Sequence, residues 1–321
     1  MKRRIQWGLL ALCLTWAGQS VAQDYPNKTI RIIAPFPAGT GPDANTREIA
    51  AELTKVLGQT VVVENRPGAS NMIGMEAGAK APADGYTLVM GSTTSLSVVP
   101  HLYGKVPYKV GDFTPISNVV ETAFLLLTHP SLQANNAREL AALAKARPGQ
   151  LSYASFGPAS SAHLAGELFS IAAGLKMIHV PYKGSAAATT DLMAGHTQLM
   201  FDSLQSSLTH VRSKRLRAIA YAGAKRSRVA PSVPTMAESG FPDVIAGSWY
   251  GVLAPANTPS AIITRLHAEI VKAANAPDVR ERLENVGVDV IATTPQEFAA
   301  AIKSDLDRWS KVVKQANIRL D

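Results

Sequence analysis

Short apolar runs that are typical of buried strands alternate with helical patterns along the first third of the chain. The ranges 30–34, 60–64 and 86–91 are mostly apolar and are followed by Pro, Asn, Gly or Ser. The segments 42–57 and 72–80 between them are predicted helices. This βαβαβ order predicts a parallel sheet covered by helices, in which the carboxyl ends of the three strands share one edge.

The apolar stretch 113–128 differs from these short runs, because it is long and has no helical stop signal. We expect two strands in tandem here, with the chain crossing from one domain to another near 120–122.

The alternating pattern then starts again and predicts a second α/β unit. Each predicted strand is followed by Gly, Ser or Asp at the start of a helix. The strands of this unit are expected at 151–155, 177–182, 198–201 and 216–222. The remaining expected elements are a returning strand at 248–255, helices at 259–274 and 278–286, a strand at 288–292 and a helix at 294–316.

Two α/β units joined by two crossings resemble the hinged two-domain fold of periplasmic binding proteins, type II-like. In this fold class, two parallel-rich sheets flanked by helices face each other across a cleft that closes around a ligand. The predicted domains are 23–121 plus 250–321 for domain 1 and 122–249 for domain 2.

The first 22 residues have the pattern of a secretory signal peptide. A basic start at 1–4 precedes an apolar segment at 5–17 and a small-x-small site that ends at Ala22. We therefore expect cleavage after Ala22 and a periplasmic location. The chain's single cysteine, Cys13, lies in this segment, and Leu12 stands where a lipoprotein signal would have a small residue. The mature chain is thus expected to contain no disulfide.

Composition and charge narrow the possible partners. The 321 residues are 46% hydrophobic and 17% charged, which is enough to bury a large core. Removal of the signal peptide would lower the formal net charge from +8 to about +5. The basic residues are scattered and few aromatic residues lie among them, so no nucleic-acid partner is expected. A modest preference for anionic ligands is compatible with this charge.

The stretch 35–43 is a candidate anion cradle. Pro35 and Pro37 end the first strand, and Pro42 suits the first turn of the following helix. Free N–H groups and the positive end of the helix dipole would then point at one place. A tight connector without a ligand is the alternative. Asp43 in the first helical turn would either complement the dipole or contact the ligand.

The stretch 156–163 has the same character in the second unit. Ser160 is expected to cap the following helix and could also donate to a ligand. A nucleophilic role is not expected, because the chain has no G-x-S-x-G motif and Ser161 and His163 are too close in sequence. His163 would either form a local hydrogen bond or contact the ligand.

Three further positions each have a structural and a ligand-binding interpretation. Asp202 would cap the next helix or accept a hydrogen bond from a ligand. Lys183 and Arg66 would be surface charges or partners of a ligand carboxylate. Trp249 would pack the hinge or form a wall of the cleft.

Cofactor and metal sites are not expected. Gly39-Thr-Gly41 follows a strand and Glu64 ends the next one, as in a dinucleotide site, but Pro42 interrupts the motif and no third glycine follows at the required spacing. The histidines show no metal-ligand spacing, and H-E-x-x-H and C-x-x-C are absent from the sequence.

Several motifs across the whole mature chain strongly resemble the Bug family, the extracytoplasmic solute receptors of tripartite tricarboxylate transporters. The motifs are Pro35-Phe-Pro-Ala-Gly39 with Asp43 and Arg47, Val62-Val-Glu-Asn-Arg-Pro-Gly68, Ala83-Asp-Gly-Tyr-Thr-Leu88, Asp112-Phe-Thr-Pro-Ile116, His163-Leu-Ala-Gly-Glu167, Val180-Pro-Tyr-Lys-Gly184, Met200-Phe-Asp202, and Ser248-Trp-Tyr-Gly251 with Ala254-Pro255.

The resemblance implies a receptor that closes like a flytrap and holds a ligand carboxylate between two helix N-termini, with ordered water bridging. The two helices would be those that open near Pro42 and Ser160. Implied ligands are di- and tricarboxylic acids, acidic amino acids or aromatic acids. Thr40 and Ser70 depart from the glycine-rich family pattern, so they could change ligand contacts.

The loop pattern and the resemblance together predict the ligand-binding residues. They are Phe36, Pro37, Ala38, Gly39, Thr40, Asp43, Gly68, Ala69, Ser92, Thr93, Gly157, Ala159, Ser160, Ser161, His163, Lys183, Asp202 and Trp249.

The predicted function is a periplasmic solute receptor, expected to be a monomer, that captures a small organic carboxylate without catalysis and delivers it to membrane transporter subunits. A sensory receptor that reports to a signalling protein has the same sequence features. An exported hydrolase that uses the same cleft is a further alternative.

Overall fold

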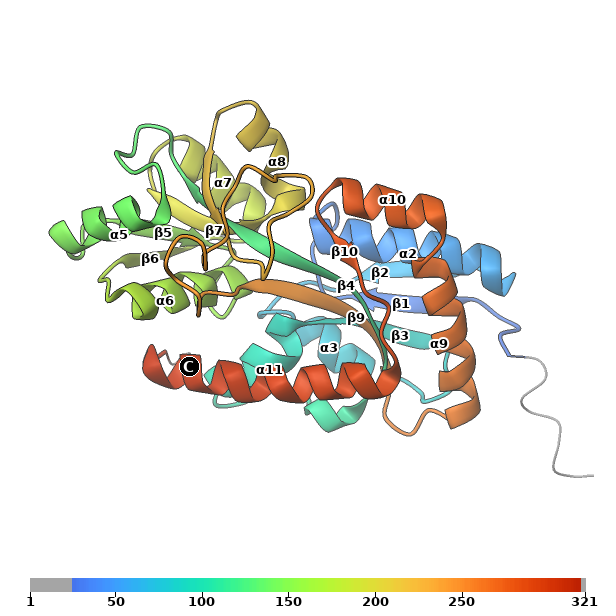
Figure 1. Ribbon diagram of the computed structural model, residues 1–321. Coiled ribbons are helices and arrows are strands. Elements are labelled where there is room, and N and C mark those ends of the chain that lie inside the picture. The colour runs from blue at the N-terminus through green and yellow to red at the C-terminus, as the bar shows by residue number, and fades with distance from the viewer. Residues whose placement is uncertain (1–24, 319–321) are drawn as a thin grey trace, which may run out of the picture.

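The computed structural model describes residues 25–318 (Figure 1). The predicted signal peptide, its cleavage site and Cys13 lie outside the described residues. Among the residues described, no helix is both long enough and apolar enough to cross a membrane.

The first half of the molecule contains the expected parallel strands. β1 (Ile30–Ala34) lies between β2 (Val61–Asn65) and β3 (Thr87–Ser92) and is parallel to both. α2 (Gly41–Leu57) follows β1, and α3 (Met72–Ala79) follows β2. The carboxyl ends of β1 and β3 therefore lie at one edge, as the sequence predicts.

The second half repeats this arrangement. β5 (Ser152–Ser155) lies between β6 (Ile178–Pro181) and β7 (Leu199–Ser203) and is parallel to both. Its helices and remaining strand are α5 (Ala137–Ala146), α6 (Ser161–Ala173), α7 (Ser185–Met193), α8 (Leu204–Arg212) and β8 (Arg217–Tyr221).

Two long strands connect the halves. β4 (Phe113–Thr128) pairs antiparallel with β9 (Gly247–Pro255) as far as Ala123, and from Phe124 onward it pairs with β7 and β8. The two sheets therefore share β4 and form one continuous sheet, in the order β2-β1-β3-β9-β4-β7-β5-β6.

The prediction of two tandem strands in 113–128 is wrong, because β4 is one strand of 16 residues. Its pairing with β9 shifts register between Pro115 and Ser117 and again between Asn118 and Val120. Pro115 has no N–H to donate to a neighbouring strand. The register shifts allow it to remain within β4 without ending the strand.

Several shorter elements were placed only approximately by the sequence. The last strand, β10, is limited to Asp289–Val290. The loop expected after β3 contains a π-helical turn (Thr94–Val98) followed by α4 (Val99–Leu102), and a 3₁₀ turn (Val110–Asp112) precedes β4. The C-terminal part contains α9 (Ser260–Ala274), α10 (Pro277–Asn285) and α11 (Pro295–Gln315).

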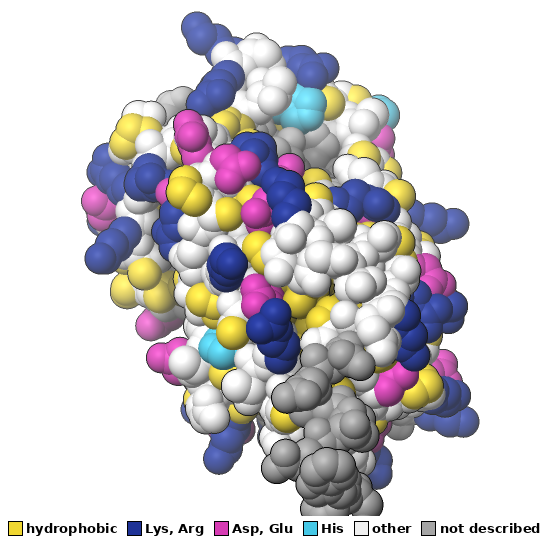
Figure 2. Space-filling view, turned by 90° about the vertical axis from the view of Figure 1, so that its right-hand side faces the viewer, with side chains coloured by type: hydrophobic (Ala, Val, Ile, Leu, Met, Phe, Trp, Pro, Cys, Tyr) yellow, Lys and Arg dark blue, Asp and Glu magenta, His cyan; other side chains and the backbone are white. Residues whose placement is uncertain are grey.

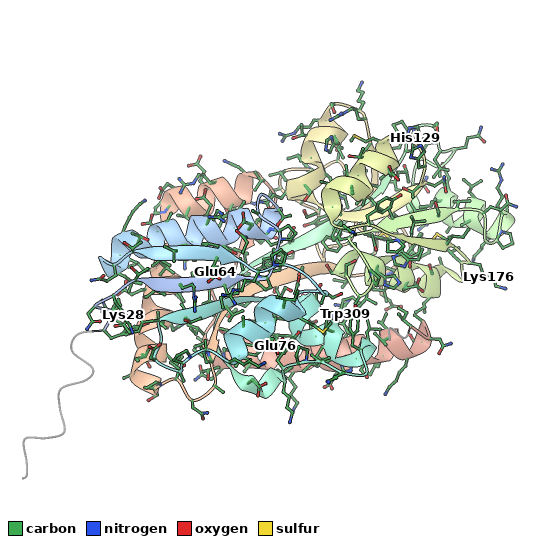
Figure 3. All side chains as sticks on the ribbon, turned by 180° about the vertical axis from the view of Figure 1, so that it is seen from behind. Lys28, Glu64, Glu76, His129, Lys176 and Trp309 are labelled. Atoms are coloured by element: carbon green, nitrogen blue, oxygen red, sulfur yellow. The ribbon has the colours of Figure 1, made fainter. Side chains whose placement is uncertain are left out.

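α11 packs along both halves of the molecule (Figure 1). Its N-terminal part places Phe298 in a buried cluster with Trp249 of β9. Near its other end, Trp309 is 1% exposed and belongs to the cluster that includes Phe124 and Tyr153 of the second half. In Figure 3, Trp309 lies near the middle of the molecule, whereas Lys28 and Lys176 lie towards opposite ends.

The surface over α9 and α10 carries charges of both signs. Figure 2 shows Lys and Arg side chains interspersed with Asp and Glu on this face. Arg282 of α10, for example, pairs with Glu48 of α2 at 3.0 Å and with Asp278 at 3.2 Å. Such exposed pairs contribute little stability, typically about 0–1 kcal/mol each.

Candidate ligand-binding site

The predicted ligand-binding residues lie mainly in loops that follow strands. Their places are the β1–α2 loop and first turn of α2 (Phe36, Pro37, Ala38, Gly39, Thr40, Asp43), the β2–α3 loop (Gly68, Ala69), the end of β3 (Ser92, Thr93), the β5–α6 loop and first turn of α6 (Gly157, Ala159, Ser160, Ser161, His163), the β6–α7 loop (Lys183), β7 (Asp202) and β9 (Trp249).

Asp43 is the residue that fixes the β1–α2 loop. Its carboxylate is 2% exposed, and Oδ2 accepts hydrogen bonds from the N–H of Gly39 at 2.8 Å and from Nε of Arg47 at 3.0 Å. Oδ1 accepts from Nδ2 of Asn65 at 2.7 Å. Burial opposes ionisation, but the hydrogen bonds from Arg47 and Asn65 outweigh it and lower the pKa of Asp43. Asp43 thus has a structural role, but that role is to fix the loop through hydrogen bonds, in addition to its position in the first turn of the helix.

The N-terminus of α2 has free backbone donors. Thr40 precedes the helix in an extended conformation, and its Oγ1 donates to the carbonyl of Pro37 at 2.7 Å, so it does not cap the helix. Within residues 25–318, the N–H groups of Ala38, Gly41 and Asp43 have no acceptor. Together with the positive end of the helix dipole, these groups favour an anion.

The N-terminus of α6 is built differently but also has free donors. Ser160 is the predicted N-cap, and its Oγ accepts from the N–H of His163 at 3.2 Å while donating to the carbonyl of Gly157 at 2.8 Å. The capping prediction is therefore confirmed. The N–H groups of Ser161 and Ala162 have no acceptor among the described residues, so backbone groups rather than the Ser160 hydroxyl are the donors available for an anion.

Two stacked histidines, His163 and His179, pack beside the β5–α6 loop and form hydrogen bonds with it. The rings of His163 and His179 are stacked with centroids 3.7 Å apart, and Nδ1 of His163 accepts from the N–H of Ala159 at 3.3 Å. Nε2 of His179 lies 2.6 Å from Oγ of Ser155. Burial and the neighbouring His179 lower the pKa of His163 to about 3, and burial lowers the pKa of His179 to about 4.

His163 therefore has the local structural role that the sequence allowed for it. The sequence did not indicate a role for His179. Its ring reaches the rings of Tyr153 and His163 only because β5 and β6 pair Tyr153 with His179.

Asp202 connects β7 to the start of α7. It is 1% exposed, and its Oδ2 accepts from Oγ of Ser185 at 2.7 Å while Oδ1 accepts from the N–H of Ser203 at 2.7 Å. Burial raises its pKa to about 6, although these hydrogen bonds act in the opposite direction. Asp202 does not cap α8 as the structural interpretation proposed. Ser203 is the cap, because it directly precedes the helix and its Oγ accepts from the N–H of Ser206 at 3.2 Å.

Two side-chain hydrogen bonds bring the loops of the two halves together. Oγ of Ser70 donates to the carbonyl of Pro158 at 3.2 Å. Nε2 of Gln205, in the first turn of α8, donates to Oδ1 of Asn45 in α2 at 3.0 Å. Sequence reasoning singled out Ser70 but missed Asn45 and Gln205, because no local pattern indicates a contact across 160 residues.

The β2–α3 loop that carries Ser70 has an unusual backbone. Gly68 has φ +123°, and Ala69, Ser70 and Asn71 follow with φ of 47°, 52° and 75°. Consecutive non-glycine residues in the left-handed region are energetically costly and occur most often at functional sites. Nδ2 of Asn71 also donates to Oγ of Ser92 at 3.3 Å, which ties this loop to the end of β3.

Trp249 and Tyr250 face opposite sides of β9, as successive strand residues do. Trp249 packs against Phe298 with ring centroids 5.2 Å apart, and its Nε1 donates to Oδ2 of Asp305 at 2.6 Å. Tyr250 instead packs edge-on against Phe36 at 5.6 Å. Trp249 thus packs against α11, and Tyr250 is the aromatic residue beside the β1–α2 loop.

The two basic candidates differ in their surroundings. Arg66 pairs with Glu64 at 2.6 Å on the surface, which agrees with its structural interpretation. Lys183 is exposed in the loop that leads into α7. Among residues 25–318, no group of three or more His, Cys, Asp or Glu is arranged to hold a metal ion.

A cavity of about 630 Å³ lies beside the two crossing strands, between α11, the end of α10 and the segment 221–229. Its lining includes Trp249, Asp305 and Trp309, and of the predicted ligand-binding residues it includes Thr93 and Trp249. Because Trp249 and Tyr250 face opposite sides of β9, this cavity is separated from the Phe36 side of the strand.

Comparisons with known proteins agree with this architecture. The model of the tripartite tricarboxylate transporter family receptor matches residues 45–318. The protein BugT of Bordetella pertussis is 38% identical over 301 residues, which cover 93% of this chain and 92% of BugT. Two similar solved structures are Rpa4515 of R. palustris with adipate (TM-score 0.87, 33% identity, 92% of this chain and 99% of that chain) and MatC of Rhodopseudomonas palustris with bound malate (TM-score 0.83, 29% identity, 90% and 100%). These likenesses confirm the predicted binding-protein fold.

Proposed function

Because the chain belongs to the receptor family of tripartite tricarboxylate transporters, we propose that it is a periplasmic receptor that captures a small organic carboxylate between its two halves. Captured ligand would be delivered to the membrane subunits of such a transporter, and no catalytic step is part of this role. Two similar proteins whose structures contain adipate and malate support a carboxylate as the ligand class.

The observation that carries the proposal is the pair of helix N-termini with free N–H groups. Gly41 and Asp43 in α2, and Ser161 and Ala162 in α6, supply backbone donors without an acceptor among the described residues. The Ser70–Pro158 hydrogen bond joins the β2–α3 loop to the loop that leads into α6, and the Asn45–Gln205 hydrogen bond joins α2 to α8. A carboxylate with two oxygens can accept hydrogen bonds from both helices at once.

The proposed moving units are 23–121 plus 250–321 and 122–249. A ligand that bridges both units would favour the closed arrangement, because it gains all its hydrogen bonds only there. Opening would break the Ser70–Pro158 and Asn45–Gln205 hydrogen bonds and would shift α11, whose Trp309 packs in the core of the second half.

The test is a calorimetric and thermal-shift screen of the mature protein against mono-, di- and tricarboxylic acids and against the corresponding neutral amides. A bound acid should raise the melting temperature by mass action, whereas its amide should not. If amides or neutral sugars stabilise the protein and no acid does, the proposed function is wrong.

A further inference from the structure

The cavity of about 630 Å³ beside the two crossing strands is not part of the proposed carboxylate site. Of the residues predicted to bind ligand, it is lined only by Thr93 and Trp249, and β9 separates it from the loop that carries Phe36. Its size is within the range of about 300–1,000 Å³ that is usual for small-molecule sites. The cavity therefore has room for a second ligand of different chemistry.

Three carboxylates line this cavity, those of Glu121, Asp289 and Asp305. Strand pairing sets Glu121 of β4 directly opposite Asp289 of β10 and, on its other side, opposite Trp249 of β9. Directly opposite residues point to the same face of a sheet, so these three side chains share one face. Nε1 of Trp249 donates to Oδ2 of Asp305 at 2.6 Å, which places the Asp305 carboxylate beside the same row.

None of the three carboxylates forms an ion pair within residues 25–318. Glu121 accepts a hydrogen bond from Nδ2 of Asn118 at 3.1 Å, whereas the carboxylate of Asp289 has no donor in the described part of the chain. Like charges directly opposite each other in a sheet are destabilising. Glu121 and Asp289 are exposed and Asp305 is half-buried, so a ligand can reach all three from the cavity.

The pKa values of these carboxyl groups indicate that their charges are not compensated. Desolvation in the cavity and the charges of Asp305 and Asp289 raise the pKa of Glu121. Burial also raises the pKa of Asp289 and that of Asp305, and it outweighs the opposing effects of their neighbours, which include Arg228 and Arg308. A bound cation would reduce the repulsion and stabilise the ionised carboxylates.

Most of the basic side chains on the cavity wall are engaged elsewhere. They are Lys225, Arg226, Arg228 and Arg308. Arg226 pairs with Glu238 at 2.8 Å. Arg228 pairs with Glu284 at 2.7 Å, and Arg308 donates to a backbone carbonyl. The fourth, a lysine, is exposed to solvent. The unpaired charge on the cavity wall is therefore mainly negative.

The lining also indicates what kind of cation fits. Within the described residues, no three His, Cys, Asp or Glu side chains are arranged to hold a metal ion. Carboxylates that are spread along one wall instead suit a ligand whose positive groups are separated from each other. The rings of Tyr221, Trp249 and Trp309 and several Ala and Gly residues complete the wall, and methylene groups can pack against them. An aliphatic chain with an ammonium group at each end has both properties.

We propose that this cavity is a second binding site, for an aliphatic diamine or polyamine held by Glu121, Asp289 and Asp305. The inference goes beyond the proposed function and does not depend on it, because none of these carboxylates belongs to the helix N-termini at which the organic acid is proposed to bind. Either proposal can fail without the other.

The experiment is titration calorimetry of the mature protein at low ionic strength with amines of matched length. Putrescine is the main probe and spermidine adds a third nitrogen, whereas butylamine has one positive charge and butanediol has none. Putrescine should bind about tenfold or more tightly than butylamine, because it can reach two carboxylates at once. Butanediol should not bind.

Two variants locate the site. Glu121→Gln and Asp289→Asn each remove one charge with little change in side-chain size, and each should weaken putrescine binding about tenfold. Glu281→Gln is the matched control, because Glu281 is exposed on α10, does not line the cavity and forms no ion pair among the described residues. It causes the same change in net charge and should leave the affinity unchanged. Circular dichroism and melting temperatures establish that all three variants are folded.

Three results would overturn the inference. They are a Kd above about 10 mM for both putrescine and spermidine, equal affinities for putrescine and butylamine, and unchanged putrescine affinity in both Glu121→Gln and Asp289→Asn. An equal loss of affinity in Glu281→Gln would also contradict it, since the amines would then respond only to net charge. If amines bind as expected and no organic acid binds, this inference stands and the carboxylate-receptor proposal fails.

Discussion

The imidazole rings of His163 and His179 are stacked almost parallel, with an interplanar angle of 4° and centroids 3.7 Å apart. Two charged imidazolium rings would repel each other strongly at this distance, so the two rings are not both charged, and their low pKa values keep both neutral near pH 7. The β5–α6 loop is therefore supported by groups that remain uncharged well below neutral pH.

The first prediction concerns stability in acid. The pKa values of about 3 for His163 and about 4 for His179 lie below the value of about 6.5 expected in the unfolded chain, so the unfolded chain binds more protons. The contribution of the His163–His179 pair to the free energy of unfolding is fully present above about pH 6.5 and is lost as the pH falls towards 4. Urea denaturation of the wild-type protein and of His179→Phe between pH 4.5 and 7.5 measures this effect.

We expect the difference in free energy of unfolding between these two proteins to shrink as the pH falls, because phenylalanine cannot bind a proton. A difference that stays constant over the whole pH range would show that His179 does not titrate differently in the folded and unfolded states.

The second prediction concerns Asp202 and has the opposite sign. Burial raises the pKa of Asp202 to about 6, so the folded protein binds more protons than the unfolded chain between about pH 4 and 6. Ionisation of Asp202 therefore lowers stability as the pH rises through this range, by up to about 3 kcal/mol. Asp202→Asn cannot ionise but can still accept from Ser185.

Relative to the wild-type protein, Asp202→Asn should gain stability as the pH is raised from 4 to 7. The measurement is the midpoint of chemical denaturation at both pH values. A relative loss of stability on raising the pH would mean that the carboxylate is stabilised at this position rather than penalised by burial.

The third prediction tests a single backbone donor. Ser161 occupies the first position of α6, where proline is tolerated, and Ser160 before it has ψ 153°, which is compatible with a following proline. Ser161→Pro removes one N–H and should weaken carboxylate binding by about 1.5–3 kcal/mol, the range for a hydrogen bond to a charged group.

Ser161→Ala is its control, because alanine removes the hydroxyl but keeps the N–H. Calorimetric titration of both variants with the same acid should show the large loss only for the proline variant. Equal affinities would place the ligand away from the N-terminus of α6.

The fourth prediction compares two exposed alanines. Ala69 has φ 47°, so Ala69→Gly should relieve strain and raise the free energy of unfolding by about 0.5–1 kcal/mol. Ala51 lies in the middle of α2, and Ala51→Gly should lower stability by about 0.5–1 kcal/mol. Thermal denaturation should therefore shift in opposite directions for the same chemical change. A destabilised Ala69→Gly would show that the left-handed loop is not strained.

Local signals made several features predictable from the sequence. Ser160 caps α6 as expected, and Thr294 and Glu297 form the reciprocal capping box at the start of α11. The parallel pairing of β1 with β2 and β3 follows from strands separated by helices. In each case the relevant residues lie close together in the chain or in a repeating pattern. The interaction can therefore be predicted from the sequence without knowledge of the tertiary structure.

Non-local features were not predictable in the same way. The continuity of β4 through Pro115 depends on β9, which lies more than a hundred residues later and tolerates shifted register. The stack of His163 on His179 depends on the pairing of β5 with β6, and the Asn45–Gln205 contact depends on how the halves approach. Asp202 does not have the expected capping role for a related reason. Its carboxylate instead accepts a hydrogen bond from Ser185 at the start of α7.

α11 has a consequence for how far the molecule can open. Phe298 near its start is packed into the first half and Trp309 near its end into the second, so one rigid helix spans the joint between them. Any rotation that separates the ligand-binding loops must make one of these two aromatic contacts slip, and it must also change the volume of the cavity beside Trp249 and Asp305. Because its two ends are anchored in different hydrophobic clusters, the C-terminal helix would resist any separation of the proposed moving units.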